Sequence, residues 1–465
     1  MALAALLEEF GADRVLGDPA AMAPFLTDHY GESRGAALAV LRPGSTAEVQ
    51  AMVRACARLG LGLVPQGGNT GLVEGGLSTD AGAGVCLSLG RLDRIRAVEP
   101  DDYSLVAEAG CVLQAVKDAA AAQDLLLPLS IGSQGSCQIG GVVSTNAGGI
   151  NVLRYGMMRD QVLGLEIVLA DGTLWDGLTT LRKNNTGPDL KQLFIGAEGT
   201  FGIVTAAALR LVPRPTARAA ALIGLPDLAA TMRCFHLARR ACSDLLSAFE
   251  FLMPPAMAVA AEALPGAPRL TGPAGVYVLI ELAAPGPVDL QGLLEGFLGQ
   301  AIELGLATDG LVAASEAQAE RIWALREAIN TGSARLGPHL RSDVSVRLSQ
   351  LPSFVAEICP AIEADQPGVR ALAFGHFGDG NVHVTVHPAP GTDPAAVPAI
   401  LARAKAVLNA RIDAYGGSIS AEHGIGRLKR ADFDLRLHEP ARGLLTDLKR
   451  MLDPVGRLNP GSLHP

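Results

Sequence analysis

The stretch ALAFGHFGDGNVHVTVH, Ala371 to His387, sets the architecture of the second half of this chain. Two short apolar runs flank a glycine-containing turn, which predicts two strands joined by that turn. His376 falls at the start of the turn, and His383 lies seven residues later on the second strand. Because glycine lets the backbone turn sharply, both imidazoles can point toward one position.

A second loop, SAEHGIG, places Glu422 and His423 next to each other. Two neutral imidazoles and a carboxylate are a common ligand set for a divalent metal with open coordination positions, which a catalytic site needs. We therefore interpret His376, His383 and Glu422 as metal ligands, with His423 beside the metal as a general base. The alternative is that these histidines are ordinary surface or core residues and that the glycines form simple turns. The gathering of three of the nine histidines in two loops favours the metal site.

The composition predicts a globular protein. A length of 465 residues suggests about two or three domains. A hydrophobic content of 49% with 18% charged residues excludes intrinsic disorder, and 54 glycines without a three-residue period exclude a collagen-like chain. The net charge of -9, with no dense block of Lys and Arg, argues against a nucleic-acid partner.

Cysteine usage and the N-terminus predict a cytoplasmic location. The seven cysteines are odd in number and show no CxxC spacing, so we expect reduced and mostly buried thiols. MALAALLEEF carries acids where a secretory signal would have its positive start, so it predicts an amphipathic helix. The sequence contains no run of about eighteen uncharged apolar residues, so no membrane span is predicted. Peripheral membrane association stays open.

The pattern of elements predicts four regions, with boundaries at 1–33, 34–215, 216–428 and 429–465. The first is a helical lead-in. In the second, the strand AALAVLRP is followed by the helix STAEVQAMVRACARLG, capped by Ser45 and ended by Gly60, and by the strand LGLVPQGG. Five more strands fit VCLSL, IRAVEP, SLVAEAG, LGLEIVLADG and IVTAAALRLVP. This pattern indicates an α/β domain.

The third region alternates longer helices with strands such as VYVLIEL and LRSDVSVRL, in addition to the two strands around the histidines. The Pro- and Gly-rich segment LPGAPRLTGPAG, Leu264 to Gly275, predicts a surface loop. The fourth region, which includes RGLLTDLKRMLDPVGRLNPG, predicts a final helix and an irregular tail.

Three glycine-rich loops mark the second region. They are PQGGNTGLVEGG (65–76), GSQGSCQIGGVVSTNAGGINVLRYG (132–156) and IGAEGTFGIVT (195–205). Glycines let successive backbone N–H groups converge on an anion. Neither GxGxxG nor GxxxxGK occurs in them, so a Rossmann dinucleotide site and a P-loop are both unsupported. The three loops together favour a large ligand held by backbone groups, and a dinucleotide fits.

These loops, together with GHFGDGNVHV, SAEHGIGRLKR and LDPVGRLNPG, resemble the FAD-linked D-2-hydroxyacid dehydrogenases of the vanillyl-alcohol-oxidase flavoprotein superfamily. Within that family they look most like D-2-hydroxyglutarate dehydrogenases. The resemblance implies an α+β fold: a two-part α/β FAD-binding domain, a cap domain with an antiparallel sheet and helices, and a C-terminal segment that returns to the FAD domain.

The resemblance also implies how FAD is held. The pyrophosphate would lie on the first loop, at Pro65, Gly67, Gly68, Asn69, Thr70, Gly71 and Leu72. The rest of the FAD would be lined by Ser133, Gly140, Ser144, Asn146, Gly149, Glu198, Gly202 and Ile203, with Asn459 near the ring. Relatives with covalent flavin often use a histidine in the first loop. None is present here, so we expect non-covalent FAD.

His376, His383 and Glu422 match the metal ligands of the family, and His423 matches its base. The implied chemistry is oxidation of a D-2-hydroxyacid to its 2-oxoacid. The metal would bind the C1 carboxylate and the C2 hydroxyl and lower the pKa of that hydroxyl. His423 would take the hydroxyl proton while a hydride passes to flavin N5. The family metal is usually zinc, and the nitrogen and oxygen ligands also suit manganese.

The substrate is predicted from four positions. Arg326, in WALREAIN, matches an arginine of the family that binds the substrate carboxylate. Residue type alone favours a surface arginine paired with Glu320 or Glu327, and only the motif match reverses that preference. Asn330, Arg341 and Thr385 replace the threonine, lysine and asparagine of the D-2-hydroxyglutarate pattern. Arg341 preserves the cation, which favours a dicarboxylate such as D-2-hydroxyglutarate or D-malate.

The residues also allow other functions. D-lactate, glycolate or an aryl hydroxyacid could replace the dicarboxylate as substrate. A flavin-free metal hydrolase and a non-catalytic flavin-binding subunit are candidates from other classes. The chain has no nicotinamide-binding motif, so the family suggests an electron-transfer flavoprotein or a quinone as acceptor. Family members are often homodimers.

Overall fold

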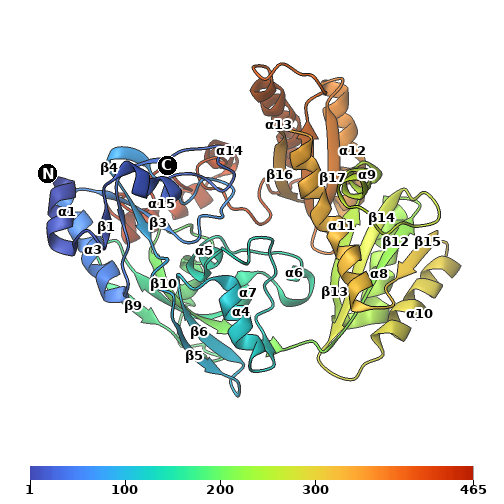
Figure 1. The fold of residues 1–465 in the computed structure, drawn as a ribbon, viewed down its shortest axis with the longest axis horizontal. Coiled ribbons are helices and arrows are strands. Elements are labelled where there is room, and N and C mark those ends of the chain that lie inside the picture. Colours follow the sequence, from blue (N-terminus) through green and yellow to red (C-terminus); the bar gives the residue numbers. More distant parts are fainter. Residues whose placement is uncertain (464–465) are drawn as a thin grey trace. The chain divides into compact units, whose positions relative to one another are not determined.

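The computed structural model describes residues 1–463 of the chain. Its contacts divide the chain into two compact units (Figure 1). The first unit comprises Met1–Gly149, Tyr155–Arg214 and Glu422–Pro465, and the second comprises Ile150–Arg154 and Pro215–Ala421.

The first sheet of the first unit is mixed. It has the order β1-β2-β4-β3, in which β2, β4 and β3 are parallel and β1 is antiparallel to β2. These strands are β1 (Val15–Leu16), β2 (Ala36–Leu41), β3 (Gly62–Gln66) and β4 (Thr79–Ser88), and α1 (Ala2–Phe10) and α2 (Pro19–Met22) lie near the start of the chain. The stretch expected as a helical lead-in therefore also supplies the edge strand β1. Leu6 of α1 is fully buried in the core of this sheet.

Helix α3 (Thr46–Leu59) connects β2 to β3, which confirms the expected strand, helix, strand unit. Its N-terminus is capped by the Ser45 hydroxyl, which accepts a hydrogen bond from the Glu48 amide at 3.2 Å. Gly60 ends the helix in the left-handed conformation, with φ of 69°.

The second sheet of the first unit is antiparallel, in the order β5-β6-β10-β8-β9. These strands are β5 (Ile95–Glu99), β6 (Ser104–Glu108), β8 (Val162–Val168), β9 (Leu174–Gly177) and β10 (Ile203–Arg210). Short β7 (Leu125–Leu126) and β11 (Val212–Pro213) pair separately. The helices of this region are α4 (Leu113–Ala121), α5 (Ile139–Ser144), α6 (Val152–Tyr155) and α7 (Met158–Gln161). The strands predicted around the glycine-rich loops are thus confirmed.

The second unit is built on a seven-stranded antiparallel sheet in the order β15-β12-β14-β13-β17-β18-β16. Its strands are β12 (Ala217–Leu225), β13 (Leu246–Leu252), β14 (Val276–Ala284), β15 (Asp309–Val312), β16 (Leu340–Ser345), β17 (Arg370–His376) and β18 (Asn381–His387). The pair β17 and β18 confirms the two strands predicted around the histidines. Leu264 to Gly275 forms a loop, as expected.

Helices cover this sheet on both faces. On one face α9 (Pro254–Ala263) and α11 (Glu316–Arg335) bury an apolar core that includes Leu252, Leu372 and Phe374 of the sheet. On the opposite face α8 (Leu228–Cys242) packs Phe235 against Phe249, with ring centroids 5.2 Å apart. The remaining helices of the unit are α10 (Leu290–Glu303), α12 (Leu351–Asp365) and α13 (Val397–Ala414).

The C-terminal segment returns to the first unit. The predicted final helix is α15 (Ala441–Leu452); a further helix, α14 (Arg430–Arg436), precedes it and was not predicted. After α15, the Leu63 amide of β3 donates to the Arg457 carbonyl at 2.9 Å, and the Asn459 amide donates to the Leu63 carbonyl at 2.7 Å. Leu458 between them is fully buried in the core of the first sheet.

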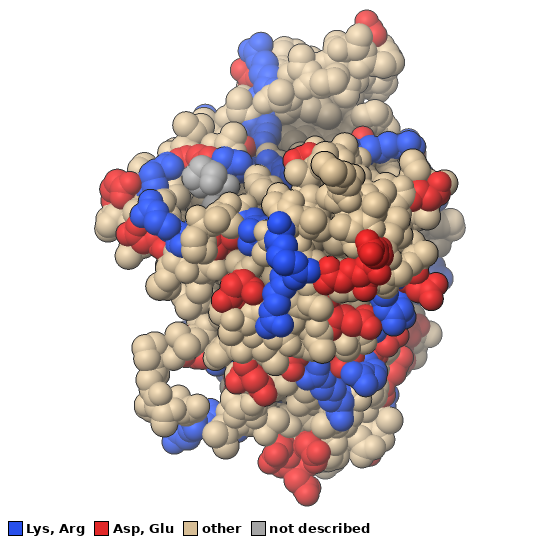
Figure 2. All heavy atoms as spheres, turned by 90° about the vertical axis from the view of Figure 1, so that its left-hand side faces the viewer, with Lys and Arg blue, Asp and Glu red and all other residues tan. Residues whose placement is uncertain are grey.

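The cysteines and the surface agree with the composition. All seven cysteines are free thiols, and six of them are buried. Within the described residues, no helix combines the length and the apolar character needed to cross a membrane. Figure 2 shows one face of the molecule, on which basic and acidic side chains are interspersed.

Candidate active site

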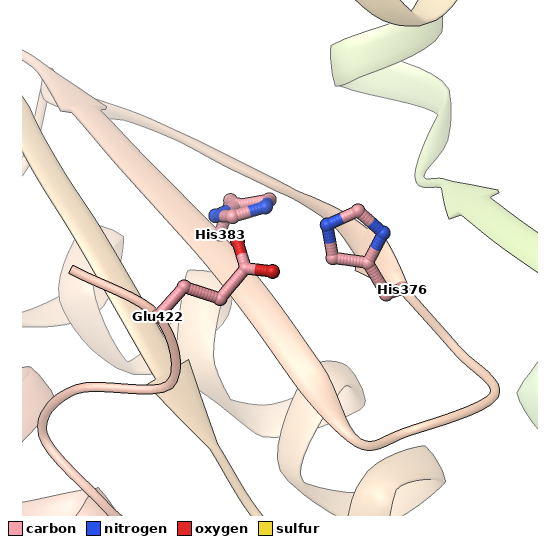
Figure 3. A group of neighbouring side chains, drawn as sticks. All are labelled: His376, His383 and Glu422. Carbon is pink, nitrogen blue, oxygen red and sulfur yellow. The ribbon is translucent and has the colours of Figure 1, made fainter. Parts of the chain in front are cut away.

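The hairpin of β17 and β18 brings its two histidines together. His376 is the last residue of β17, and His383 is the third residue of β18. Their ring centroids lie 5.4 Å apart. Each of His376, His383 and Glu422 offers a ligand atom, and these atoms all lie within 4.8 Å of one another. Figure 3 shows a ring nitrogen of His376 turned toward the carboxylate of Glu422 and toward His383.

Glu422 is held by contacts of its own carboxylate and of the preceding residue. The amide of Ala421 donates to the Asp343 carboxylate at 3.1 Å, and Asp343 is fully buried on β16. The amide of Gly149 donates a short hydrogen bond to the Glu422 carboxylate. His423 follows directly and is half-buried.

Two buried carboxylates face the Nδ1 atoms of the histidines. His376 Nδ1 lies 2.5 Å from Glu250 Oε1, and His383 Nδ1 lies 3.7 Å from Asp343 Oδ1. Burial would raise the pKa of Glu250, but His376 and Arg326 outweigh it and hold that pKa below its usual value. Neither acid was predicted from the sequence as part of the site. A charged residue within the otherwise apolar strand SAFEFL was the available signal for Glu250.

This donor set fits a divalent metal. An imidazole whose Nδ1 faces a carboxylate presents Nε2 as the ligand atom, which is the usual arrangement at zinc sites. Two imidazoles and one carboxylate suit zinc and, because nitrogen and oxygen donors are mixed, also manganese. The geometry therefore allows a metal that keeps open positions for a substrate.

Arg326 is not a surface residue. It lies on α11 with 7% exposure, and its Nε donates to Glu250 Oε2 at 3.1 Å. Its guanidinium carbon lies 4.7 Å from the centre of the Phe374 ring. The alternative of a solvent-exposed arginine paired with a neighbouring glutamate is therefore wrong.

The other predicted substrate residues lie on the same unit. Thr385 of β18 is buried with 6% exposure and is in register with Arg341 of β16, which is exposed. Cross-strand partners point to the same face of a sheet, so Arg341 and Thr385 share the face of His383. Asn330 is exposed on α11, about one turn after Arg326.

The glycine-rich loops of the first unit meet closely. A Cβ atom on Gly68 would lie 2.0 Å from the Ser136 carbonyl oxygen, so only glycine allows the first two loops to pack against each other. A Cβ atom on Gly71 would meet nothing within 4 Å, so the backbone there borders open space. Closely packed loops with accessible backbone fit the pyrophosphate of a dinucleotide.

The C-terminal tail joins these loops through Asn459 and Glu198. The Asn459 side chain donates to the Glu198 carbonyl at 2.7 Å and to the Gly75 carbonyl at 2.9 Å. The Glu198 carboxylate accepts hydrogen bonds from the amides of Ile425 and Gly426, at 2.7 and 2.8 Å. Burial raises the pKa of Glu198. Because other groups of the protein already bind the Glu198 carboxylate, the backbone of Glu198 is the part that could line a flavin.

The remaining predicted FAD residues lie along the same loops. In the first loop, Pro65 is on β3, and the residues after it are Gly67, Asn69, Thr70 and Leu72. In the second loop, Ser133 precedes α5, Gly140 and Ser144 lie within α5, and Asn146 and Gly149 follow it. In the third loop, Gly202 and Ile203 lie at the start of β10. Gly140 and Gly202 are also needed for packing, because a Cβ atom on either would lie within 2.8 Å of a neighbouring side chain.

Comparisons with known proteins agree with this arrangement. Residues 37–177 match the family described as FAD binding domain, and residues 214–463 match FAD linked oxidases, C-terminal domain. The chain is 38% identical to the mitochondrial D-2-hydroxyglutarate dehydrogenase of Bos taurus, over 99% of this chain and 83% of the relative. It is also 38% identical to a D-2-hydroxyglutarate dehydrogenase of Xanthomonas citri pv. viticola, over 92% of this chain and 89% of the relative.

Solved structures show the same fold. The 4-ethylphenol oxidase from Gulosibacter chungangensis superposes with a TM-score of 0.71 at 20% identity, covering 100% of this chain and 96% of that one. The fold is therefore that of the vanillyl-alcohol-oxidase-type flavoproteins, with a mixed α+β architecture. The chain belongs to the FAD-linked D-2-hydroxyacid dehydrogenase family and is similar over nearly its full length to proteins named D-2-hydroxyglutarate dehydrogenase. It is an FAD-dependent oxidoreductase.

Proposed function

We propose that this enzyme oxidises a D-2-hydroxy dicarboxylic acid, D-2-hydroxyglutarate or D-malate, to the corresponding 2-oxoacid. The observation that carries the proposal is the convergence of donor atoms from His376, His383 and Glu422 within 4.8 Å. Two relatives at 38% identity are named D-2-hydroxyglutarate dehydrogenase, which supports D-2-hydroxyglutarate as the first substrate to test.

A divalent metal held by these three residues would bind the substrate's C1 carboxylate and C2 hydroxyl and lower the hydroxyl pKa. His423, next in the chain to Glu422, is proposed to accept the hydroxyl proton. Arg326 is proposed to bind a substrate carboxylate through the terminal nitrogens of its guanidinium, since its Nε is directed to Glu250. Bound FAD supplies the acceptor for the hydride from C2.

Arg341 and Thr385 are proposed to select the far end of the substrate. They lie two residues along their strands from Asp343 and His383, which corresponds to about 7 Å. Arg341 would therefore offer a cation beyond the metal site for the second carboxylate of a dicarboxylate. D-lactate and glycolate have no second carboxylate for Arg341, and they form the alternative within the same family.

Flavin bleaching under anaerobic conditions tests the proposal. The purified protein is expected to be yellow and to bleach on adding D-2-hydroxyglutarate but not the L-isomer. Removal of the metal with a chelator is expected to abolish bleaching while the FAD remains bound, and added zinc or manganese should restore it. Absence of bleaching with every D-2-hydroxyacid tested would refute the reaction.

The acceptor and the assembly are proposed on family grounds. An electron-transfer flavoprotein or a quinone would reoxidise the flavin, and the chain would form a homodimer. The bovine relative is named as mitochondrial, so the cytoplasmic location of this chain stays a prediction.

A further inference from the structure

The buried carboxylate of Glu250 lies between a proposed metal ligand and a proposed substrate-binding cation. Glu250 belongs to β13 and is 1% exposed. Its Oε1 is 2.5 Å from His376 Nδ1, and its Oε2 accepts a hydrogen bond from Arg326 Nε at 3.1 Å. The two oxygens of one side chain thus serve two different functional groups.

The fold places these three side chains together from three elements of one unit. Glu250 and His376 are directly opposite each other on the neighbouring antiparallel strands β13 and β17. Arg326 reaches the same point from α11, where it lies over the ring of Phe374. Leu325 and Ile329 of α11 are fully buried against this sheet face, so the helix cannot shift easily.

Burying a carboxylate is costly unless it is paired and hydrogen-bonded. Glu250 meets this requirement only with both partners, because each of its oxygens has one of them. The carboxylate in turn restrains the imidazole, since a hydrogen bond at Nδ1 fixes both the tautomer and the direction in which Nε2 points. It also restrains the guanidinium, whose terminal nitrogens form the planar fork that recognises carboxylates.

We propose that Glu250 is a positioning residue that couples the metal site to the substrate-carboxylate site, by orienting His376 with one oxygen and Arg326 with the other. The proposal rests on the proposed function, in which His376 binds a metal and Arg326 binds the substrate. It predicts that one substitution weakens two separable properties, the affinity for the metal and the affinity for the substrate at saturating metal.

The substitution Glu250→Gln tests this coupling. A glutamine has one acceptor oxygen, so it cannot accept hydrogen bonds from His376 and Arg326 on separate oxygens. Metal affinity, measured on the FAD-loaded enzyme by competition with a chromophoric zinc chelator, is expected to fall about 10- to 100-fold. The visible absorption of the cobalt-substituted enzyme is expected to change as the orientation of His376 relaxes. At saturating metal, KM for D-2-hydroxyglutarate is expected to rise about tenfold or more.

Glu281→Gln is the matched control. Glu281 lies on the neighbouring strand β14 and accepts a hydrogen bond from Trp323 of the same helix α11 at 2.9 Å. Its removal disturbs the same contact between helix and sheet without touching His376 or Arg326. Metal affinity, the cobalt spectrum and KM are expected to stay within about threefold of wild type, since no contact to the metal ligands is lost.

Glu250→Asp gives a second test should the glutamine variant not retain FAD. It keeps the charge but withdraws the carboxylate by one methylene, so both contacts lengthen. At least about fivefold weaker metal binding is expected. The coupling would be overturned by a wild-type enzyme that binds metal together with a folded Glu250→Gln or Glu250→Asp variant whose metal affinity and KM are unchanged. That result would leave the proposed function intact. A wild type that binds no metal would overturn both.

Discussion

At the scale of single residues, His423 is the side chain with the most specific proposed task. It follows Glu422 in the chain, which places a base next to a metal ligand without a second element. The proton of the C2 hydroxyl needs an acceptor within hydrogen-bond reach, and a neutral imidazole supplies one near neutral pH.

We expect His423→Asn to slow flavin reduction by D-2-hydroxyglutarate about 10²- to 10⁴-fold, because general-base catalysis typically contributes that much. FAD and metal content should stay at wild-type levels, and stopped-flow absorbance measures the rate. His438→Ala removes an exposed histidine of the same C-terminal segment and serves as the control. A reduction rate within threefold of wild type would exclude His423 as the base.

Arg341 gives a second prediction at this scale. Arg341→Ala is expected to remove about 1 to 2 kcal/mol of transition-state stabilisation for D-2-hydroxyglutarate, which is measured as a lower kcat/KM. The loss is modest because Arg341 is exposed and solvent screens its charge. D-lactate, which lacks a second carboxylate, should be affected much less. Arg335→Ala, at the exposed end of α11, is the control. Equal losses on both substrates would contradict a distal-carboxylate role.

At the scale of elements, a carboxylate joins the second sheet of the first unit to helix α3. Glu166 of β8 accepts hydrogen bonds from Thr205 of β10 at 2.7 Å, from Thr46 of α3 at 2.7 Å and from Arg96 of β5 at 2.9 Å. Burial would raise the pKa of Glu166, but the hydrogen bonds from Arg96, Thr205 and Thr46 outweigh it and hold that pKa below its usual value. The ionised form is therefore the one that stabilises the fold.

The sign of the pH dependence follows from this lowered pKa. The unfolded chain binds a proton at Glu166 at higher pH than the folded chain does, so the stabilisation is complete above about pH 5 and is lost as the pH falls through the folded-state pKa. Glu166→Gln is expected to lower the stability at pH 7 by about 1 to 3 kcal/mol. The difference from wild type should shrink below about pH 4. Urea unfolding at several pH values measures this, with exposed Glu99→Gln as control. A loss independent of pH would contradict the argument.

At the scale of the whole molecule, the chain leaves the first unit at Arg214 and re-enters it at Glu422. The last segment then forms backbone hydrogen bonds to strand β3 of the first sheet. Lys449 of α15 donates hydrogen bonds to the carbonyls of Thr200 and Leu458, at 2.8 and 2.9 Å. Residues more than two hundred positions apart thus stabilise the same glycine-rich region.

We expect Leu458→Ala to destabilise the first unit by about 2 to 5 kcal/mol, because it leaves a cavity at a fully buried position. The variant should also lose FAD more readily, since Asn459, next in the chain, is bonded to Glu198 and Gly75. Thermal unfolding and flavin release by ultrafiltration measure both effects. Val455→Ala, at a position 69% exposed, should behave as wild type. Stability and flavin retention equal to wild type in Leu458→Ala would refute this account.

The sequence determined those features that depend on local pattern. The capped helix α3, the glycine-rich loops and the two strands around His376 and His383 all follow from residue type and spacing over a few positions. The metal-ligand trio could be proposed for the same reason, because its members fall in two short loops with distinctive residues. Helix α14 was missed, since its seven residues give too short a stretch for helical periodicity to be recognised.

The tertiary structure alone decided which distant residues meet. Arg326 could be read as a surface side chain until α11 was placed on the sheet, where it is buried against Glu250, 76 positions earlier. Glu250 itself could not be assigned, because the meaning of a charge in an apolar strand depends on the strand that pairs with it, here β17 with His376 at its end. Register and helix packing are set by the sum of many weak contacts over the whole unit, and no short stretch of sequence contains that sum.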